Sequence, residues 1–295
     1  MTRIRTNAKL NLFLNLMGRR TDGYHEIETI FHGISLGDDL ELHRTDTGRV
    51  EVEMTLSEGL DGLVPSQDDN IAWHAAQRLI ERGATNDGLH IKVLKRIPLG
   101  AGLGGGSSNA AGVLTALNEL WDMNLDRPTL LEVAGLVGSD VPYCISGGTA
   151  LATSRGEKLT PLPSPGPMWF VLGIEERPLL TRDVYEAWDE LGPSEPALSS
   201  PMSLALGAGD IEEVALLLHN DLERAVFVLR PELADKKAAL VGAGALGASM
   251  SGSGPTMFGI ARGEEHAHSV ASGVKEVFEQ VLVVPSSTEC VERLD

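Results

Sequence analysis

A glycine-rich segment near residue 100 has the residue types and the spacing of a phosphate site. Residues 98–111 read PLGAGLGGGSSNAA, with the glycines placed before two serines. Apolar and polar residues alternate over 89–93 as in a half-buried strand, and the apolar residues of 110–121 recur at helical spacing. A helix that begins near Ser107 or Ser108 directs unpaired N–H groups and the positive end of its dipole toward the glycines. The segment is therefore predicted to hold a phosphate, because a flexible linker would not be flanked so closely by a strand and a helix.

Two familiar phosphate motifs fit this segment less well. A P-loop needs Gly-Lys-Ser/Thr, and no lysine follows these glycines. A dinucleotide fingerprint is loosely satisfied by Gly100, Gly102 and Gly105, but it is normally followed, about 20 residues on, by an acidic residue at the end of a second strand. Residues 119–126 instead end the predicted helix and form the turn before the next proline. The sequence therefore disfavours both motifs.

Two further segments carry side chains suited to phosphoryl transfer, which usually needs a carboxylate to take the proton of the acceptor hydroxyl. Asp140 lies in the sequence GSDVP (138–142), in a turn that ends a predicted helix over 130–137. An aspartate in such a turn can be a rigid base or a simple capping residue. Lys9 and Asn11 alternate with the apolar residues of a predicted strand and so share one face of it. The residues alone leave open whether that face is a site or solvent.

Aromatic and amide side chains are candidates for recognising a base. Tyr24 and His25 follow a Thr-Asp-Gly turn, and loop tips often carry recognition residues. Ring packing and a solvated imidazole explain an arbitrary Tyr-His pair more simply. Asn70 begins a predicted helix over 71–82, where capping explains it as well as ligand binding does. Asn109 is similarly ambiguous.

The composition is that of a globular protein and excludes several classes. The chain has 295 residues, enough for two domains or one large one. Its 24 Lys and Arg against 42 Asp and Glu give a net charge of −18, which opposes binding to nucleic acid or to an anionic membrane. No apolar run is long enough to span a bilayer, so the cytoplasm is the expected compartment. The two cysteines and the remaining histidines lack metal-ligand spacing, so no metal ligand is assigned.

Alternating and helical patterns are mixed along the chain, which predicts the α+β class. A proline-rich stretch at 161–167 separates the halves, and we place the boundary there, between domains 1–163 and 164–295. In the first half the patterns predict strands over 9–16, 50–56 and 89–93 and helices over 71–82, 108–121 and 130–137. In the second half they predict helices over 182–191, 211–226, 231–239 and 264–278 and strands over 168–174, 256–261 and 281–284.

The glycine-rich segment resembles the ATP-binding signature of the GHMP small-molecule kinases, Pro-x-x-x-Gly-Leu-Gly/Ser-Ser-Ser. It departs from that pattern because Gly105 and Gly106 precede the serines. The branch of the superfamily that acts on 4-diphosphocytidyl-2-C-methyl-D-erythritol has the same variation. Further segments that resemble this branch extend the likeness over nearly the whole chain: 8–14, 20–26, 138–142, 220–223 and 251–256.

The resemblance implies a fold, an activity and a cleft. The expected fold is a two-domain GHMP kinase with a ribosomal-protein-S5-like N-terminal domain, a ferredoxin-like C-terminal domain and the active site between them. The expected enzyme uses ATP, with Mg²⁺, to phosphorylate the 2-hydroxyl of the cytidyl substrate on the non-mevalonate route to isoprenoid precursors. Its expected partner is a small molecule that carries cytidine diphosphate, not nucleic acid or a membrane.

The same resemblance implies roles for individual residues. Asp140 is the expected base, and Lys9 is expected beside the acceptor hydroxyl, where a cation offsets charge on the transferred group. Residues expected at ATP are Asn70, Lys95, Pro98, Gly100, Gly102, Leu103, Gly104, Gly105, Gly106, Ser107, Ser108 and Asn109. Residues expected at the acceptor, besides Asp140, are Asn11 to orient it, Tyr24 and Tyr185 to stack on cytosine, His25 to hydrogen-bond to cytosine, and Thr181.

Two other functions stay open at this point. One is a kinase of the same superfamily for a simpler alcohol such as mevalonate, homoserine or a sugar, and the Tyr24–His25 pair and residues 220–223 argue against it. The other is a nucleotide-binding module without catalysis. The combination of Lys9 and Asp140 argues against that function, because a binding module needs no base.

Overall fold

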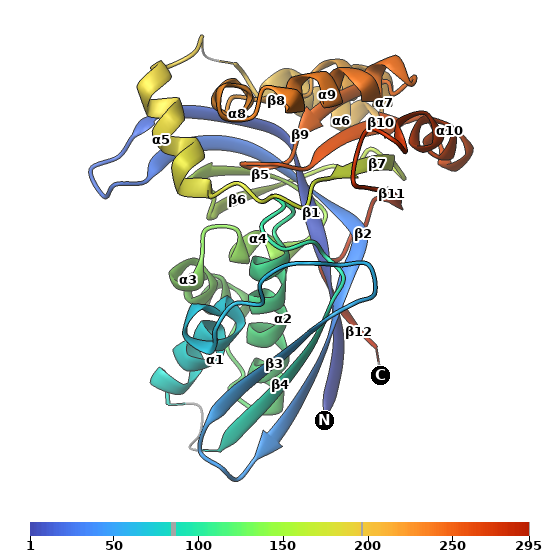
Figure 1. The fold of residues 1–295 in the computed structure, drawn as a ribbon. Helices are drawn as coiled ribbons and strands as arrows, with labels where there is room; N and C mark the ends of the chain where they lie inside the picture. The colour runs from blue at the N-terminus through green and yellow to red at the C-terminus, as the bar shows by residue number, and fades with distance from the viewer. Residues whose placement is uncertain (84–86, 196, 295) are drawn as a thin grey trace.

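The chain forms two sheets with helices packed against them, and the computed structural model describes residues 1–83, 87–195 and 197–294 (Figure 1). The strands of the first sheet are β1 (Thr2–Arg19), β2 (His25–Thr45), β3 (Val50–Leu56), β4 (Gly88–Lys95), β5 (Thr149–Ser154), β6 (Lys158–Leu162), β8 (His219–Asn220) and β12 (Val291–Arg293). In the described residues the main order is β12–β1–β2–β4–β3, with β5 and β6 attached to β2 and β8 attached to β1.

Two long strands, β1 and β2, connect the halves of the molecule. They have 18 and 21 residues, and Figure 1 shows them as blue ribbons that run from the lower sheet up to the C-terminal half. Their antiparallel register shifts between Asn7 and Ala8 and again between Asn11 and Phe13. Bulges of this kind bend a strand pair and redirect its side chains. Lys9 lies between the two bulges, at the level where the halves meet.

Four helices cover one face of the lower part of the first sheet (Figure 1): α1 (Ile71–Glu81), α2 (Gly105–Leu120), α3 (Arg127–Val137) and α4 (Val141–Ser146). A hydrophobic core lies between them, in which Leu40 and Leu42 of β2 and Leu114 and Leu117 of α2 are completely buried. Burying each of these leucines contributes roughly 2 kcal/mol. The packing fixes α2, and therefore the position of its N-terminus.

The second sheet consists of β7 (Trp169–Ile174), β9 (Gly247–Met250), β10 (Met257–Ala261) and β11 (Gln280–Pro285). Its strands are antiparallel, in the order β11–β7–β10–β9. Numbered within this sheet, the order is 4-1-3-2, which is the order of a ferredoxin-like fold. The chain is thus α+β, as expected.

The two faces of the second sheet have different partners because its strand residues alternate. Phe170 and Leu172 face the first sheet and pack with Leu10 and Leu12, whereas Val171 faces the helices. The helices of this half are α5 (Thr181–Leu191), α6 (Ser200–Ala208), α7 (Ile211–Leu216), α8 (Glu223–Leu229), α9 (Glu232–Gly242) and α10 (Glu264–Val274). Within the described residues no helix has the length and apolarity to cross a membrane.

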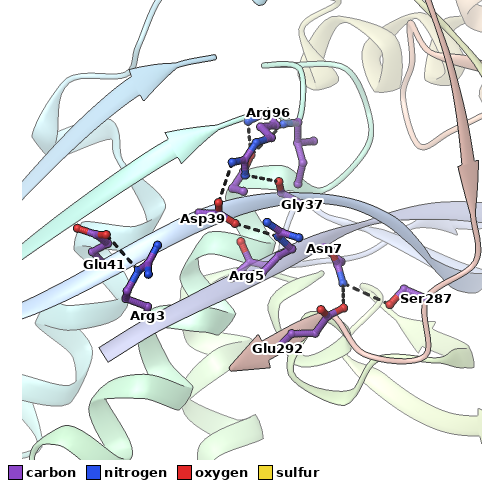
Figure 2. A network of polar contacts seen from close by, with 12 residues as sticks. Arg3, Arg5, Asn7, Gly37, Asp39, Glu41, Arg96, Ser287 and Glu292 are labelled. Atoms are coloured by element: carbon purple, nitrogen blue, oxygen red, sulfur yellow. Dashed lines mark hydrogen bonds and ion pairs between the residues drawn. The ribbon is translucent and has the colours of Figure 1, made fainter. Parts of the chain in front are cut away.

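A C-terminal segment returns from the second sheet to the first. β12 pairs with β1, and the amide of Asn7 donates to Ser287 Oγ (3.3 Å) and to the carboxylate of Glu292 (Figure 2). Apart from β8 and β12, the strands of the first sheet end at Leu162, and the second sheet begins at Trp169. The division into 1–163 and 164–295 stays a prediction, and β12 lies in the sheet of the other half.

A charged cluster beside this junction ties three segments together. Arg5 Nε and an Arg96 guanidinium nitrogen both donate to the Asp39 carboxylate, at 2.9 and 2.7 Å (Figure 2). Arg96 also donates to Gly37 O at 3.3 Å. These pairs are partly exposed, so each contributes modestly to stability. Their position matters more, because Arg96 immediately precedes the glycine-rich segment.

The single helix expected over 211–226 is wrong. The chain forms α7, then the short strand β8, then α8. Asn220 pairs in parallel with Leu14, and its side chain donates to Met250 O (2.7 Å) and Gly252 O (2.8 Å). These long-range bonds outweigh the local helical pattern.

Most other predicted elements are present with shifted ends. The strand predicted over 50–56 has the expected bounds, and the helix expected from Ser107 or Ser108 begins already at Gly105. The strand expected over 9–16 is the middle of the much longer β1.

A buried histidine lies between the two sheets. His32 is 1% exposed, its Nδ1 is 2.9 Å from Thr149 Oγ1, and its ring is 5.6 Å from that of Phe170. Burial lowers its pKa from the usual 6.5 to about 4. His32 is thus neutral in the folded protein at neutral pH.

We expect His32 to make the fold sensitive to acid. The unfolded chain takes up a proton near pH 6.5 that the folded chain refuses until about pH 4. The free energy of unfolding is therefore unaffected by His32 above pH 6.5. It falls as the pH drops toward 4, by up to roughly 3 kcal/mol. Urea unfolding across this range should show a shallower pH dependence for His32→Gln. The exposed His268→Gln is the control, and an equal slope in wild type and His32→Gln would contradict the assignment.

Candidate active site

Two adjoining hollows share the glycine-rich loop as a common wall. The larger, of about 780 Å³, lies between β1, β2, the start of α4 and α5. The smaller, of about 300 Å³, lies between the loop and the starts of α1 and α2. Gly102 and Gly104 line both. Every residue expected at ATP except Ser108 lines the smaller hollow, and every residue expected at the acceptor lines the larger one.

The loop presents a row of unused backbone donors. The first hydrogen bond of α2 runs from Ser108 N–H to Gly104 O at 2.9 Å. Within the described chain, the N–H groups of residues 104–107 donate no hydrogen bond. They lie at a helix N-terminus, where the dipole also favours negative charge. These N–H groups are therefore available to an anion, and the phosphate site itself stays a prediction.

Two glycines of the loop cannot be replaced without movement of their neighbours. Gly102 and Gly104 have φ of +77° and +71°, which L side chains rarely adopt. A Cβ at Gly102 would lie 2.1 Å from Ser251 O, and one at Gly104 would lie 3.0 Å from the Lys9 side chain. The loop is thus held between the 251–254 turn on one side and Lys9 on the other.

Lys9 and Asp140 meet where the two hollows join. Lys9 is only 3% exposed, and its Nζ donates to Asn11 Oδ1 (2.7 Å) and to Gly102 O (2.9 Å). The Asp140 carboxylate lies 3.7 Å from this ammonium and lines the larger hollow. Asp140 precedes α4, but its side chain makes no capping bond there. The carboxylate is thus free to act on a ligand.

Burial dominates the electrostatics of Lys9. It lowers the pKa of the ammonium below its ordinary value, and Asp140 partly opposes this effect. Asn11 is engaged on both ends, because its Oδ1 accepts from Lys9 and its Nδ2 donates to Thr29 Oγ1 at 2.8 Å. Asn11 therefore fixes the lysine as well as lining the cleft.

A buried carboxylate anchors the smaller hollow. Asp38 is fully buried and accepts from Lys95 Nζ (2.5 Å), from Asn109 Nδ2 (2.8 Å) and from two backbone N–H groups after β4. Burial lowers the pKa of Lys95 below its ordinary value, and the nearby Asp38 carboxylate only partly opposes this effect. A Cβ at Gly105 would lie 2.6 Å from Lys95 Nζ, so the lysine lies directly beneath the glycine loop.

The amide and hydroxyl candidates separate into different roles. Asn70 caps α1, because its Oδ1 accepts from Ala72 N–H at 2.9 Å, and it also lines the smaller hollow. Asn109 Oδ1 is buried without a hydrogen-bond partner in the described residues, and it belongs to the same lining. Ser108 is fully buried, and its hydroxyl donates to Asn7 O, away from either hollow. Leu103 is buried too, and it lines the smaller hollow.

Aromatic rings gather at the far end of the larger cleft. The Tyr24 residue is 53% exposed. The rings of His25 and Tyr185 are in contact, with their centroids 4.8 Å apart. His25 Nε2 is 2.8 Å from Asp189 Oδ1. Because a carboxylate oxygen accepts, Nε2 carries the hydrogen of this contact, and in the neutral form of the ring Nδ1 is an acceptor. Among the ring pairs of the described residues, none joins Tyr24 directly to Tyr185.

One face of α5 lines the cleft. It includes Asp189, a residue that the sequence analysis did not predict there. Thr181, Tyr185 and Asp189 recur at i, i+4 and i+8 and all line the cleft. Thr181 Oγ1 also lies 3.0 Å from Ser253 Oγ of the 251–254 turn. The helical spacing was the signal for Asp189. Arg155 also lines the cleft, from a turn where no sequence pattern singles it out.

The described residues contain no cluster of three or more His, Cys, Asp or Glu side chains that could hold a metal ion.

Family models match both halves of the chain. The GHMP kinases N-terminal domain matches residues 70–148, and the GHMP kinases C-terminal domain matches residues 202–280. A solved homoserine kinase from Cytophaga hutchinsonii, 22% identical with a TM-score of 0.78 over 99% of this chain and 97% of its own, has the same fold. The fold is that of a GHMP kinase.

Closer relatives narrow this class. A 4-diphosphocytidyl-2-C-methyl-D-erythritol kinase of Shouchella clausii is 40% identical over 95% of this chain and 93% of its own, and one of Gloeobacter violaceus is 38% identical over 92% and 89%. A crystal structure of 4-(cytidine 5'-diphospho)-2C-methyl-D-erythritol kinase is 33% identical, with a TM-score of 0.79 over 97% of this chain and 99% of its own. The chain belongs to the family of 4-diphosphocytidyl-2-C-methyl-D-erythritol kinases.

The close approach of Gly104 to Lys9 makes a test with a matched control. Gly209 has the same φ, +71°, but a Cβ there meets only an ordinary contact at 3.5 Å. Gly104→Ala and Gly209→Ala should both lose about 1–2 kcal/mol of stability to backbone strain. Only Gly104→Ala should also lose turnover, by about 100-fold, because it displaces Lys9. Urea unfolding and steady-state kinetics measure the two effects, and equal turnover in both variants would refute the constraint on Lys9.

Proposed function

We propose that this chain transfers the γ-phosphoryl group of ATP to the 2-hydroxyl of 4-diphosphocytidyl-2-C-methyl-D-erythritol, a step toward isoprenoid precursors, in the cytoplasm. The observation that carries the proposal is the Lys9–Asp140 pair, 3.7 Å apart at the junction of the two hollows. A donor in the smaller hollow and an acceptor in the larger one would meet at this pair.

The smaller hollow suits ATP. The free N–H groups of residues 104–107 are placed to bind its phosphates, and the hydroxyl of Ser107 lies in the same lining. Asn109 Oδ1, buried without a partner in the described part of the chain, would accept from a donor on the nucleotide, and Asn70 borders the same space. Mg²⁺ would arrive with the triphosphate and neutralise part of its charge.

Lys9 and Asp140 would carry the chemistry. Asp140 accepts the proton of the acceptor hydroxyl as its oxygen bonds to the γ-phosphorus, and the bond to the β-phosphate oxygen breaks to release ADP. The Lys9 ammonium offsets negative charge on the transferred group, and its burial strengthens that effect. Asn11 and Gly102 O hold the lysine in place through the ground state and the transfer.

The larger hollow suits a cytidyl group. Tyr24 and Tyr185 would provide stacking surfaces for cytosine. His25 Nδ1 would accept from the exocyclic amino group of cytosine, because Asp189 holds the other ring nitrogen. Thr181 lies beside them on the same cleft wall.

Release of ADP with a panel of acceptors tests the proposal. Turnover is expected with 4-diphosphocytidyl-2-C-methyl-D-erythritol and not with 2-C-methyl-D-erythritol 4-phosphate, which lacks the cytidyl group. Mevalonate and homoserine are the controls for a simpler acceptor. Turnover with either would refute the acceptor assignment, and ATP binding without ADP release from any acceptor would favour a binding module.

Asp140→Asn removes the proposed base without changing the size of the side chain. Turnover should fall by about 10²- to 10⁴-fold, while ATP binding stays within about twofold because Asp140 does not line the smaller hollow. Kinetics and calorimetric ATP titration measure the two quantities, and circular dichroism checks the fold. Near-wild-type turnover would rule out the base.

A further inference from the structure

A buried amide in the smaller hollow is satisfied on one side only. Asn109 is 1% exposed, and its Nδ2 donates to Asp38 Oδ2 and to Thr6 Oγ1, both at 2.8 Å. These two bonds use both hydrogens of the amide. Its Oδ1 is buried without a partner among the described residues, although Asn109 lines the hollow. An acceptor thus stands open where ATP is expected.

Asp38 determines which way this amide faces. A carboxylate only accepts, so a reversed amide would set its oxygen against Asp38 Oδ2. The Thr6 hydroxyl can donate or accept, so it permits either orientation. The carboxylate is itself fixed, because it is fully buried and its Oδ1 accepts from the N–H groups of Arg96 (2.7 Å) and Ile97 (2.9 Å). Asp38 therefore keeps Asn109 Oδ1 on the opposite side of the amide, where a ligand can use it.

The chemistry of this acceptor selects the part of ATP that it can bind. The phosphate oxygens of MgATP are acceptors, so they offer no hydrogen to a carbonyl oxygen. A bound cation is disfavoured, because the Lys95 ammonium donates to the same Asp38 Oδ2 at 2.5 Å. The groups that remain are the N–H and O–H donors of the nucleoside, which are the 6-amino group of adenine and the ribose hydroxyls.

We infer that Asp38 is a positioning residue, which turns the Asn109 carbonyl oxygen to accept a hydrogen bond from the nucleoside of ATP; this rests on the proposed function. A buried acceptor without a partner is unfavourable, and a nucleotide that supplies the hydrogen relieves it. A nucleotide without a donor at this place leaves the oxygen unpaired, so the site rejects it. Asp38 is not part of the lining and thus acts on the choice of nucleotide through Asn109.

Binding of four nucleotides to the wild type, with no acceptor present, is the first test. The probes are ATP, inosine triphosphate, which has an oxo group in place of the 6-amino group, and 2′-deoxy-ATP and 3′-deoxy-ATP, which each lack one ribose hydroxyl. In calorimetric titrations one of the three analogues should bind about tenfold or more weakly than ATP. Weak binding of inosine triphosphate assigns the bond to adenine, and weak binding of a deoxy analogue assigns it to the ribose. Equal binding of all four overturns the inference.

Asp38→Asn keeps the size of the side chain but gives it an N–H donor. Its oxygen can stay on the N–H groups after β4, so its nitrogen faces Asn109, and the Asn109 amide should reverse. The affinity ratio of ATP to the weak analogue should then fall by about tenfold, whereas the KM for the cytidyl acceptor should change by less than about twofold. Loss of the Lys95 pairing acts on the triphosphate that all four probes share, so the ratio isolates Asn109. An unchanged ratio overturns the inference.

Two variants are matched controls. Thr6→Val removes the other acceptor of Asn109 and keeps the shape of the side chain, and the ratio should be unchanged because Asp38 still sets the orientation. Glu175→Gln alters a buried carboxylate that pairs with Lys236 at 2.5 Å in the other half, and it should lower thermal stability without changing the ratio. A ratio lost in Thr6→Val would overturn the role of Asp38, and a ratio lost in Glu175→Gln would overturn it in favour of general destabilisation.

Asn109→Ala keeps the inference testable if Asp38→Asn does not fold. It removes the open oxygen, so the ratio should fall as in Asp38→Asn, and the double variant should lose no more than either single one. Discrimination retained in Asn109→Ala, or losses that multiply in the double variant, would overturn the inference. Failure of the proposed function is a separate result, in which the wild type selects among nucleotides but releases no ADP with the cytidyl acceptor.

Discussion

The buried ammonium of Lys9 is the constraint on which the site depends. Removing such a charge from water costs several kcal/mol unless partners replace its hydration. Here the partners come from three separate segments: Asn11 on β1, Gly102 in the glycine loop and Asp140 before α4. Because all three segments contact the same ammonium group, a shift of one segment displaces the ammonium relative to the other two. The two hollows are thereby aligned with each other.

A second set of polar bonds fixes the turn that supports the glycine loop. Asn220 donates to Met250 O and Gly252 O, on both sides of Ser251, whose hydroxyl donates to Gly102 O at 2.9 Å. Asp221 accepts from the Trp188 indole at 3.0 Å and so links the same segment to α5. The positions of the glycine loop and of α5 therefore depend on one short strand, β8.

Local patterns and motif resemblance were enough to predict a large part of the fold and of the candidate site. Alternation along β1 placed Lys9 and Asn11 on one face, and the structure brings their side chains into contact. The burial of single polar side chains could not be predicted in this way, so the helical pattern of 108–121 did not reveal that the Ser108 hydroxyl donates to Asn7 O inside the fold. The helix expected over 211–226 failed for a related reason, because its break is imposed by partners distant in sequence. Asp189 has a visible helical spacing from Tyr185, but no local pattern pairs it with His25, which is 164 residues away in the sequence.

Strand β1 pairs with strands that are synthesised early, in the second half and at the end of the chain. It pairs with β2 immediately after it, with β8 in the second half and with β12 at 291–293. During translation the first of these pairings can form early, but the edge of the sheet at Ile4 to Thr6 has no partner until residues 291–293 have left the ribosome. An unpaired strand edge is a site for association with other chains. The nascent protein thus carries an exposed edge through most of its synthesis, and the return of β12 closes it.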